Sequence, residues 1–287
     1  MRKITFSLLS VALAGAFVGS SAYAAEGARA LKDVHWPDEG AFGTYDQASL
    51  QRGYQVYKEV CSSCHTLNLL SYRDLGEKGG PGFKPAEVEA LAAMSKVPAG
   101  PDDKGEIIDE NGQLRMRPAL PSDHFAMPFQ NEQAARANNG GALPPDLSVI
   151  VKARYRGPAY VYSLISGFEE GAKRPPCLGE TPGKYYNPHF ANGEVSDACK
   201  DKDGIPTIEG SLIGMAPPLT NGRVDFADGT PNTIEQEAHD VVAFLNWAAD
   251  PHMNERKKLG FQVMAYLGIL AAFFYVSYRR IWRDVEH

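Results

Sequence analysis

The residues best suited to chemistry are two cysteines and a histidine within the stretch V-C-S-S-C-H-T-L, residues 60–67. Cys61 and Cys64 are three positions apart, so one helical turn places both thiols on the same side, and His65 follows directly. C-x-x-C-H is the attachment signature of a c-type haem, in which both thiols bond to the vinyl groups and the histidine binds the iron. Zinc binding, thiol–disulfide exchange and simple packing are the alternatives.

The rest of the sequence argues against these alternatives. A zinc site needs a second pair of ligands at similar spacing, and the other two cysteines, Cys177 and Cys199, are far apart. Thiol–disulfide exchange places C-x-x-C at the start of a helix after a strand, in a βαβ context that this sequence lacks. We therefore expect one covalently bound haem c on Cys61 and Cys64, with His65 as an axial iron ligand.

The N-terminus indicates export. Arg2 and Lys3 precede an apolar run, residues 4–18, and Ala22-Tyr23-Ala24 provides a signal-peptidase site, so residues 1–24 are predicted to be a cleaved signal peptide. Export places the remaining cysteines in an oxidising compartment. Since the haem occupies Cys61 and Cys64, we predict that Cys177 and Cys199 form a disulfide.

The C-terminus indicates a membrane anchor. Residues 259–278 contain no charged side chain, and twenty residues at 1.5 Å each span about 30 Å, the thickness of a hydrocarbon core. Three basic residues lie on each side of this run, so the positive-inside rule does not decide its orientation. The signal peptide does: the head, residues 25–254, is exported, and residues 255–287 form the anchor and a short cytoplasmic tail.

The head is acidic. The chain has 29 basic and 35 acidic residues; the first 24 residues hold two of the basic ones, and residues 255–287 hold six basic and three acidic ones. The head keeps 21 basic and 32 acidic residues, a net charge of −11. This charge disfavours nucleic acid as a partner and attracts a basic protein over long range.

The elements that must position these residues are mainly helical. Residues 49–60 place Leu50, Tyr54, Tyr57 and Val60 on one apolar stripe, and residues 233–249 form a second amphipathic helix. Residues 147–153 and 160–168 are also expected to be helical. Residues 76–139 are rich in breakers and predict long loops with short helices. The expected class is mainly α with extensive irregular structure, without a repeat or a linker that would divide the head.

The second axial ligand separates an electron carrier from an enzyme with an open iron site. Met127 and Met215 both precede prolines that stiffen the chain, as an axial methionine requires. His35, His124, His189, His239 and His252 are further candidates. Residue types alone do not choose between the two methionines.

Motifs along most of the chain provide a more specific indication. Together they resemble the cytochrome c1 family, the haem subunit of quinol–cytochrome c reductase, also called the cytochrome bc1 complex. The matching stretches are R-G-Y-Q-V-Y-K-E-V-C-S-S-C-H (52–65), S-Y-R-D-L (71–75), A-A-R-A-N-N-G (134–140), L-P-P-D-L-S (143–148), K-A-R-Y (152–155), Y-V-Y-S-L-I-S-G-F (160–168), Y-Y-N-P-H-F (185–190), M-A-P-P-L (215–219), D-G-T-P (228–231) and D-V-V-A-F-L-N-W-A-A-D-P (240–251).

The resemblance assigns site residues. It implies that Met215 is the second axial ligand, that Arg154 and Tyr160 bond a haem propionate, and that Pro145 packs on the haem. The implied fold is a mainly α cytochrome c fold, enlarged by long loops, with a single C-terminal transmembrane helix. In such a fold the helix at 49–60 crosses the helix at 233–249, with Gly53 allowing close approach. An extra glycine after Asn138 and Asn139 leaves those two residues unassigned.

The resemblance also implies a function. The chain would be the electron-carrying subunit of ubiquinol–cytochrome c reductase, without substrate chemistry of its own. It would take one electron from a Rieske iron–sulfur protein and pass it to a soluble basic cytochrome c, within a dimeric complex that contains cytochrome b. The segment between Cys177 and Cys199 and the signal peptide indicate the bacterial type, in the inner membrane with the haem domain in the periplasm.

Two alternatives remain at this point. One is a membrane-anchored haem enzyme with an open iron coordination site, and the other is a membrane-tethered thiol oxidoreductase. For the electron carrier, we expect acidic residues such as Glu169 and Glu170 to steer the basic partner.

Overall fold

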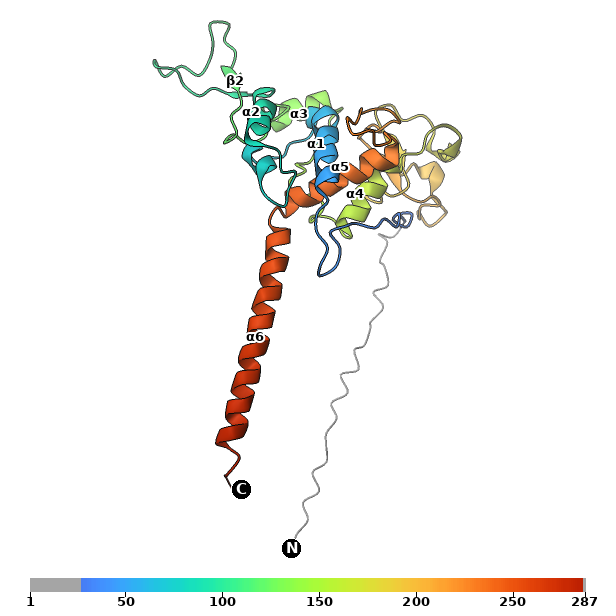
Figure 1. Ribbon diagram of the computed structural model, residues 1–287. Helices are drawn as coiled ribbons and strands as arrows, with labels where there is room; N and C mark the ends of the chain where they lie inside the picture. Colours follow the sequence, from blue (N-terminus) through green and yellow to red (C-terminus); the bar gives the residue numbers. More distant parts are fainter. Residues whose placement is uncertain (1–26, 286–287) are drawn as a thin grey trace.

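A computed structural model of the chain describes residues 27–285, so the predicted signal peptide lies outside the described residues. A helical head sits at one end of a single long helix (Figure 1). The elements are α1 (Gln47–Glu59), α2 (Pro85–Ala93), β1 (Lys96–Pro98), β2 (Met116–Pro118), α3 (Glu132–Asn138), α4 (Gly157–Ser166), β3 (Tyr185–Asn187), β4 (Ser211–Ile213), α5 (Ile234–Ala249) and α6 (Met253–Ile281). The mainly α class predicted from the sequence is confirmed.

The centre of the head is the crossing of α1 and α5. Asp46 caps α1 by accepting a hydrogen bond from the Ser49 amide, and Thr233 caps α5 by accepting one from the Gln236 amide. At the crossing, a Cβ atom built on Gly53 would lie 2.0 Å from the Asp240 carbonyl oxygen. Only glycine permits this approach, so the predicted crossing and the predicted role of Gly53 are confirmed.

Aromatic side chains pack around the crossing. The predicted stripe of α1, from Leu50 to Val60, is buried, and the rings of Tyr54 and Tyr57 lie 5.7 and 5.9 Å from that of Phe244 on α5. Phe125, from the loop after β2, packs on both tyrosines from outside. Ring pairs in this range add to the hydrophobic burial that stabilises the core.

A charged pair also joins the two helices. Arg52 on α1 donates from Nε to Asp240 Oδ2 at 2.7 Å, and Asp240 is fully buried. Burial opposes ionisation of this carboxyl, but His239 Nδ1 at 3.6 Å and hydrogen bonds from Arg52 and Gln236 outweigh it and lower the pKa of Asp240. The α1–α5 crossing therefore contains a satisfied carboxylate.

The helix predicted at 160–168 corresponds to α4, which begins and ends slightly earlier and packs against α5. The prediction of a helix at 147–153 is wrong, because these residues form a succession of turns. Asp146 Oδ1 accepts from the Ser148 amide and Arg156 has a φ of 51°, so the chain is held in turns before α4 begins. Local side-chain bonding thus overrides the apolar helical pattern.

The long breaker-rich region contains short elements. Helices α2 and α3 are joined by a projecting arm, residues 96–118, whose base is the antiparallel pair of β1 and β2, with Val97 opposite Arg117 (Figure 1). A second pair, β3 and β4, places Tyr186 opposite Leu212. Around it lies a small separate core of Leu178, Tyr186, Cys199 and Leu212. The predicted disulfide, Cys177–Cys199, joins this lobe with an S–S distance of 2.04 Å.

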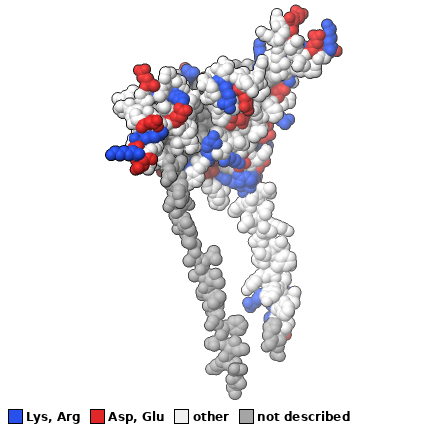
Figure 2. All heavy atoms as spheres, turned by 180° about the vertical axis from the view of Figure 1, so that it is seen from behind, with Lys and Arg blue, Asp and Glu red and all other residues white. Residues whose placement is uncertain are grey.

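Helix α6 contains the predicted apolar run and is the one helix among the described residues that is long and apolar enough to cross a membrane. It extends the predicted span at both ends, to Met253 and Ile281. At its start, Asp250 accepts from Arg256 at 2.5 Å and pairs with Lys152 at 3.1 Å. Lys and Arg side chains gather at the base of the head, and most of α6 below them is uncharged (Figure 2).

Candidate functional site

The C-x-x-C-H residues lie where α1 ends. After Glu59, residues Cys61–Ser63 form one tight 3₁₀ turn, and the amides of Cys64 and His65 both donate to the Cys61 carbonyl, at 3.1 and 2.9 Å. The turn keeps the two cysteines close without pairing them. Burial raises the pKa of the Cys61 thiol to about 12, which favours its protonated form at neutral pH.

The imidazole of His65 is held by a hydrogen bond to a distant backbone carbonyl. Its Nδ1 lies 2.8 Å from the carbonyl oxygen of Pro145, 80 positions along the chain. A carbonyl oxygen can only accept, so Nδ1 carries the proton and Nε2 keeps the lone pair that a metal ion needs. Burial lowers the pKa of His65, which favours the neutral ring.

The neighbouring Asp146 links the two chain segments that form this contact, one around His65 and the other around Pro145. Its Oδ2 accepts from Thr66 Oγ1 at 2.6 Å and from the Asn68 amide at 2.9 Å, while the Leu147 amide donates to the Thr66 carbonyl at 2.9 Å. Burial opposes its ionisation, yet hydrogen bonds from Ser148, Thr66 and Asn68 lower the pKa of Asp146. Sequence reasoning missed Asp146, although the L-P-P-D-L-S motif contains it.

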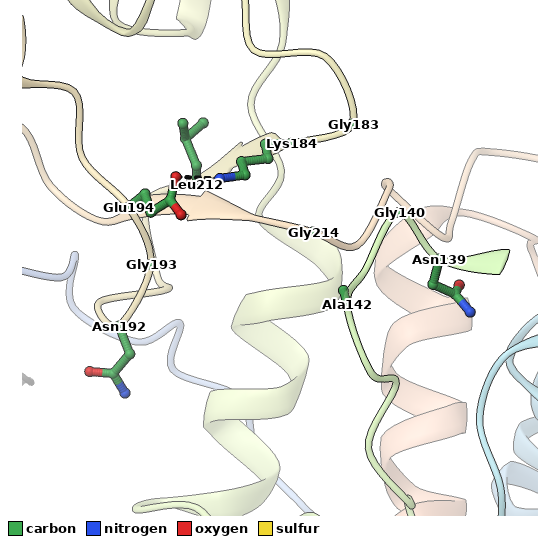
Figure 3. Close-up of a pocket in the computed structure, with 10 residues that line it drawn as sticks. All are labelled: Asn139, Gly140, Ala142, Gly183, Lys184, Asn192, Gly193, Glu194, Leu212 and Gly214. Atoms are coloured by element: carbon green, nitrogen blue, oxygen red, sulfur yellow. Dashed lines mark hydrogen bonds and ion pairs between the residues drawn. The ribbon is translucent and has the colours of Figure 1, made fainter. Parts of the chain in front are cut away.

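Met215 lies two residues after the end of β4, and its segment lies beside the one that leads to Pro145. A Cβ atom on the preceding Gly214 would lie 3.1 Å from that of Ala142, three positions before Pro145. Gly214 and Ala142 also line an open cavity of about 400 Å³, which lies between the segment leading to Pro145 and the β3–β4 lobe (Figure 3). Met215 is half-buried, whereas Met127 is 57% exposed.

The two expected propionate-binding residues lie near each other. Tyr160, in the first turn of α4, is half-buried, and Arg154 is exposed in the turn before it, donating from Nη1 to the Ala153 carbonyl at 3.1 Å. Burial raises the pKa of Tyr160 and the charge of Arg154 opposes that rise, so the two groups interact electrostatically. Within residues 27–285, the structure shows no direct contact between Arg154 or Tyr160 and the two expected iron ligands, His65 and Met215.

Asn138 and Asn139, which the family motifs left unassigned, form hydrogen bonds with their own helix, α3. Asn138 and Asn139 donate from their side-chain amides to the carbonyls of Ala134 and Ala135, at 2.8 and 2.7 Å. Gly140 and Gly141 follow with φ angles of 60° and 89°. Both glycines hold conformations that other residues rarely adopt, so the extra glycine belongs to the turn that ends α3.

Of the two acidic residues expected to steer a partner, one is already paired. Glu169 lies 2.5 Å from Arg29 Nη1, and its side chain is 19% exposed. Glu170, the next residue, is exposed.

Within the described part of the chain, His, Cys, Asp and Glu residues do not gather in groups of three or more that could hold a metal ion. The donors around Cys61 are instead those of a covalent haem: two thiols on one turn and an imidazole with Nε2 available as a ligand. Two thiols and one imidazole are one ligand short of a structural zinc site, and they match the attachment set of a c-type haem.

A sequence profile described as the cytochrome C1 family matches residues 36–285. The chain belongs to the cytochrome c1 family. It is 42% identical to cytochrome c1 of Rhodospirillum rubrum, over 94% of each chain, and 39% identical to cytochrome c1 of Cereibacter sphaeroides, over 100% of this chain and 97% of the relative. It is also 40% identical to the cytochrome b/c1 protein of Bradyrhizobium diazoefficiens over 96% of its own length, and it spans 39% of that longer protein.

Family membership confirms the resemblance seen in the motifs and gives the general role of the chain. A cytochrome c1 is an electron-transfer subunit of a cytochrome bc1 complex and carries a covalent haem c. Cys61 and Cys64 are the cysteines available for this attachment, because the other two form the disulfide.

Proposed function

We propose that this chain carries single electrons from a Rieske iron–sulfur protein to a soluble basic cytochrome c, as the haem subunit of a dimeric ubiquinol–cytochrome c reductase that also contains cytochrome b. The observation that carries the proposal is the His65–Pro145 contact in a chain of the cytochrome c1 family, since it prepares one nitrogen for permanent iron ligation. A relative named cytochrome b/c1 supports the partnership with cytochrome b.

Each site residue has a distinct role in this proposal. The thiols of Cys61 and Cys64 would form the thioethers, His65 Nε2 and Met215 Sδ would bind the iron, and Pro145 would pack on the haem while its carbonyl holds the His65 ring. Arg154 and Tyr160 bond a propionate, where a guanidinium and a phenol suit a carboxylate. When bound, the haem supplies an iron that cycles between ferric and ferrous, with a potential that a methionine ligand raises. In this proposal the chain carries electrons and performs no substrate chemistry of its own.

The same proposal places the chain in the membrane. Residues 1–24 are removed as a signal peptide, residues 25–254 form the haem domain in the bacterial periplasm, and residues 255–287 form the anchor with a cytoplasmic C-terminus. The apolar helix α6 and the bacterial relatives support this arrangement.

A redox titration of two matched variants tests the ligand assignment. We expect Met215→Leu to lower the haem midpoint potential strongly, because it removes the thioether ligand, and Met127→Leu to leave the potential close to the parent value. The open-site haem enzyme is tested by the spin state of the parent protein. A high-spin resting iron that binds small ligands readily, or a lost potential in Met127→Leu alone, would overturn the proposal.

A further inference from the structure

A short loop lies beside the start of α6 and exposes a phenylalanine. Residues 38–44, the Phe42 loop, connect buried Trp36 to α1, and in Figure 1 the loop near the N-terminal end of the described chain hangs from the side of the head that α6 leaves. Phe42 is 83% exposed, the largest exposed fraction among the large apolar residues of the described head. The packing of the head does not account for this exposure.

The backbone of the Phe42 loop is closed from two sides. The Thr44 amide donates to the Pro37 carbonyl at 3.2 Å, and a Cβ atom on Gly43 would lie 2.1 Å from the Glu39 carbonyl oxygen. Lys257 of α6 then donates to the carbonyls of Asp38 and Gly43, at 2.6 and 3.0 Å. The loop is therefore held to the first turns of α6 by a residue of that helix.

The polar side chain at the base of the loop points into the head. Asp38 Oδ2 accepts from Asn246 Nδ2 of α5 at 2.7 Å, and burial raises the pKa of Asp38. At the tip, Gly40-Ala41-Phe42-Gly43 carries no charge. Asp38 is therefore turned toward the protein and the Phe42 ring outward, while the other charged residue of the loop, Glu39, is exposed and lies 3.7 Å from His35.

The ring of Phe42 meets α6 within the apolar run. Its centroid lies 6.2 Å from that of Phe261, in an edge-to-face arrangement. Phe261 is 64% exposed and lies two residues after Leu259, so the contact is about 3 Å beyond the start of the apolar run. Basic residues 256–258 precede the run, at the depth where lysine and arginine mark a membrane surface (Figure 2).

We propose that the Phe42 loop is a second membrane contact, in which Phe42 inserts into the boundary between lipid headgroups and acyl chains beside the first turn of the α6 apolar run. Phe42 extends the apolar surface of α6 at the same depth, so the partner that contacts this ring is lipid, as it is for the anchor. Two contacts restrict the tilt of the head relative to the membrane. The proposal rests on the membrane placement given under Proposed function.

Collision accessibility of spin labels tests this contact in the assembled bc1 complex, reconstituted in vesicles of phosphatidylcholine and phosphatidylglycerol. Three exposed apolar residues are replaced singly: Phe42→Cys at the loop, Ile107→Cys on the arm as an aqueous control, and Phe273→Cys on α6 as a bilayer control. Ile107 is 54% and Phe273 66% exposed, so neither the labels nor the substitutions disturb packing in the chain. The measured quantity is the ratio of collisions with oxygen, which dissolves in lipid, to collisions with a water-soluble nickel chelate.

We expect the ratio at Phe42 to exceed that at Ile107 by on the order of threefold or more, because the ring position lies within the apolar boundary. A ratio at Phe42 equal to that at Ile107 would show a water-exposed loop and overturn the proposal. Low collision rates with both reagents would show that another protein subunit covers Phe42, and would also overturn it. In both cases Phe273 still reports lipid; a water-like ratio at Phe273 would instead contradict the membrane anchor itself and the Phe42 contact with it.

Discussion

At the scale of single residues, the site depends on a partner that is distant in sequence. His65 obtains its tautomer from the Pro145 carbonyl, and Asp146 holds that carbonyl in place by bonding Thr66 and Asn68 on the histidine side. A carboxylate that accepts several hydrogen bonds in a half-buried position is worth more than a surface polar group, because removing it leaves the donors unsatisfied.

We predict that Asp146→Asn destabilises the protein by about 2 kcal/mol at pH 7, since the amide cannot accept all three hydrogen bonds. The pKa of Asp146 is lowered in the folded protein, so its stabilisation is complete above the unfolded value of about 3.9 and is lost as the pH falls through the lower folded value. Urea unfolding as a function of pH measures this: the difference between parent and variant should shrink below about pH 4.

The matched control for this prediction is Asp197→Asn. The Asp197 side chain is 97% exposed and pairs with Lys200 three positions away, so the control should change stability little. An equal loss of stability in both variants would contradict a special role for Asp146.

The residues of the site were predictable from the sequence to different degrees. Cys61, Cys64 and His65 are visible because their spacing is local, and the Cys177–Cys199 disulfide follows from counting cysteines in an exported chain. The His65–Pro145 contact is invisible to such reasoning, because the carbonyl acceptor belongs to the backbone and lies 80 positions away. The roles of Met215, Arg154 and Tyr160 come from the family motifs and remain predictions.

At the scale of elements, the position of the haem motif depends on the close crossing of α1 and α5, because the motif begins where α1 ends. We predict that Gly53→Ala destabilises the head by about 2 kcal/mol, since the new methyl group would overlap the Asp240 carbonyl and Phe244 Cβ and force the helices apart. This cost exceeds the gain of up to about 1 kcal/mol that alanine brings to a helix. Denaturant unfolding of the haem-containing protein measures the change.

Gly268→Ala is the matched control, because nothing lies within 4 Å of a Cβ atom built at that position of α6. It makes the same substitution within a helix without a backbone approach, so the unfolding of the head should not change. A Gly53→Ala protein as stable as its parent would mean that the crossing can relax without cost.

The elements themselves were predictable where their pattern reflects burial. The stripes of α1 and α5 and the uncharged run of α6 follow directly from side-chain type, and all three form helices. The pattern fails at residues 147–153, where Asp146 and Ser148 bond the backbone and replace the helix by turns. The β1–β2 and β3–β4 pairs also escaped prediction, since each strand has three residues and too few positions to show alternation.

At the scale of the whole molecule, the chain combines a head that is acidic by composition with a base where Lys and Arg gather and an apolar anchor below it, the last two visible in Figure 2. Each of these regions follows from composition, so the overall arrangement was the most predictable feature of the chain. What composition could not give is which charges remain available to a partner. Glu169 is paired with Arg29, whereas Glu170 beside it is exposed.

We predict that electron transfer from the proposed reductase to a basic soluble cytochrome c slows on the order of tenfold or more from low to high ionic strength, because salt screens attraction to a head of charge −11. Stopped-flow rate constants measure this. Glu170→Gln should lower the low-salt rate more than Glu110→Gln, which removes the same charge from the exposed arm, and both should match the parent at high salt. A rate constant that does not change with ionic strength would exclude electrostatic steering. Equal effects of the two variants would mean that the steering comes from the charge of the whole head and not from Glu170.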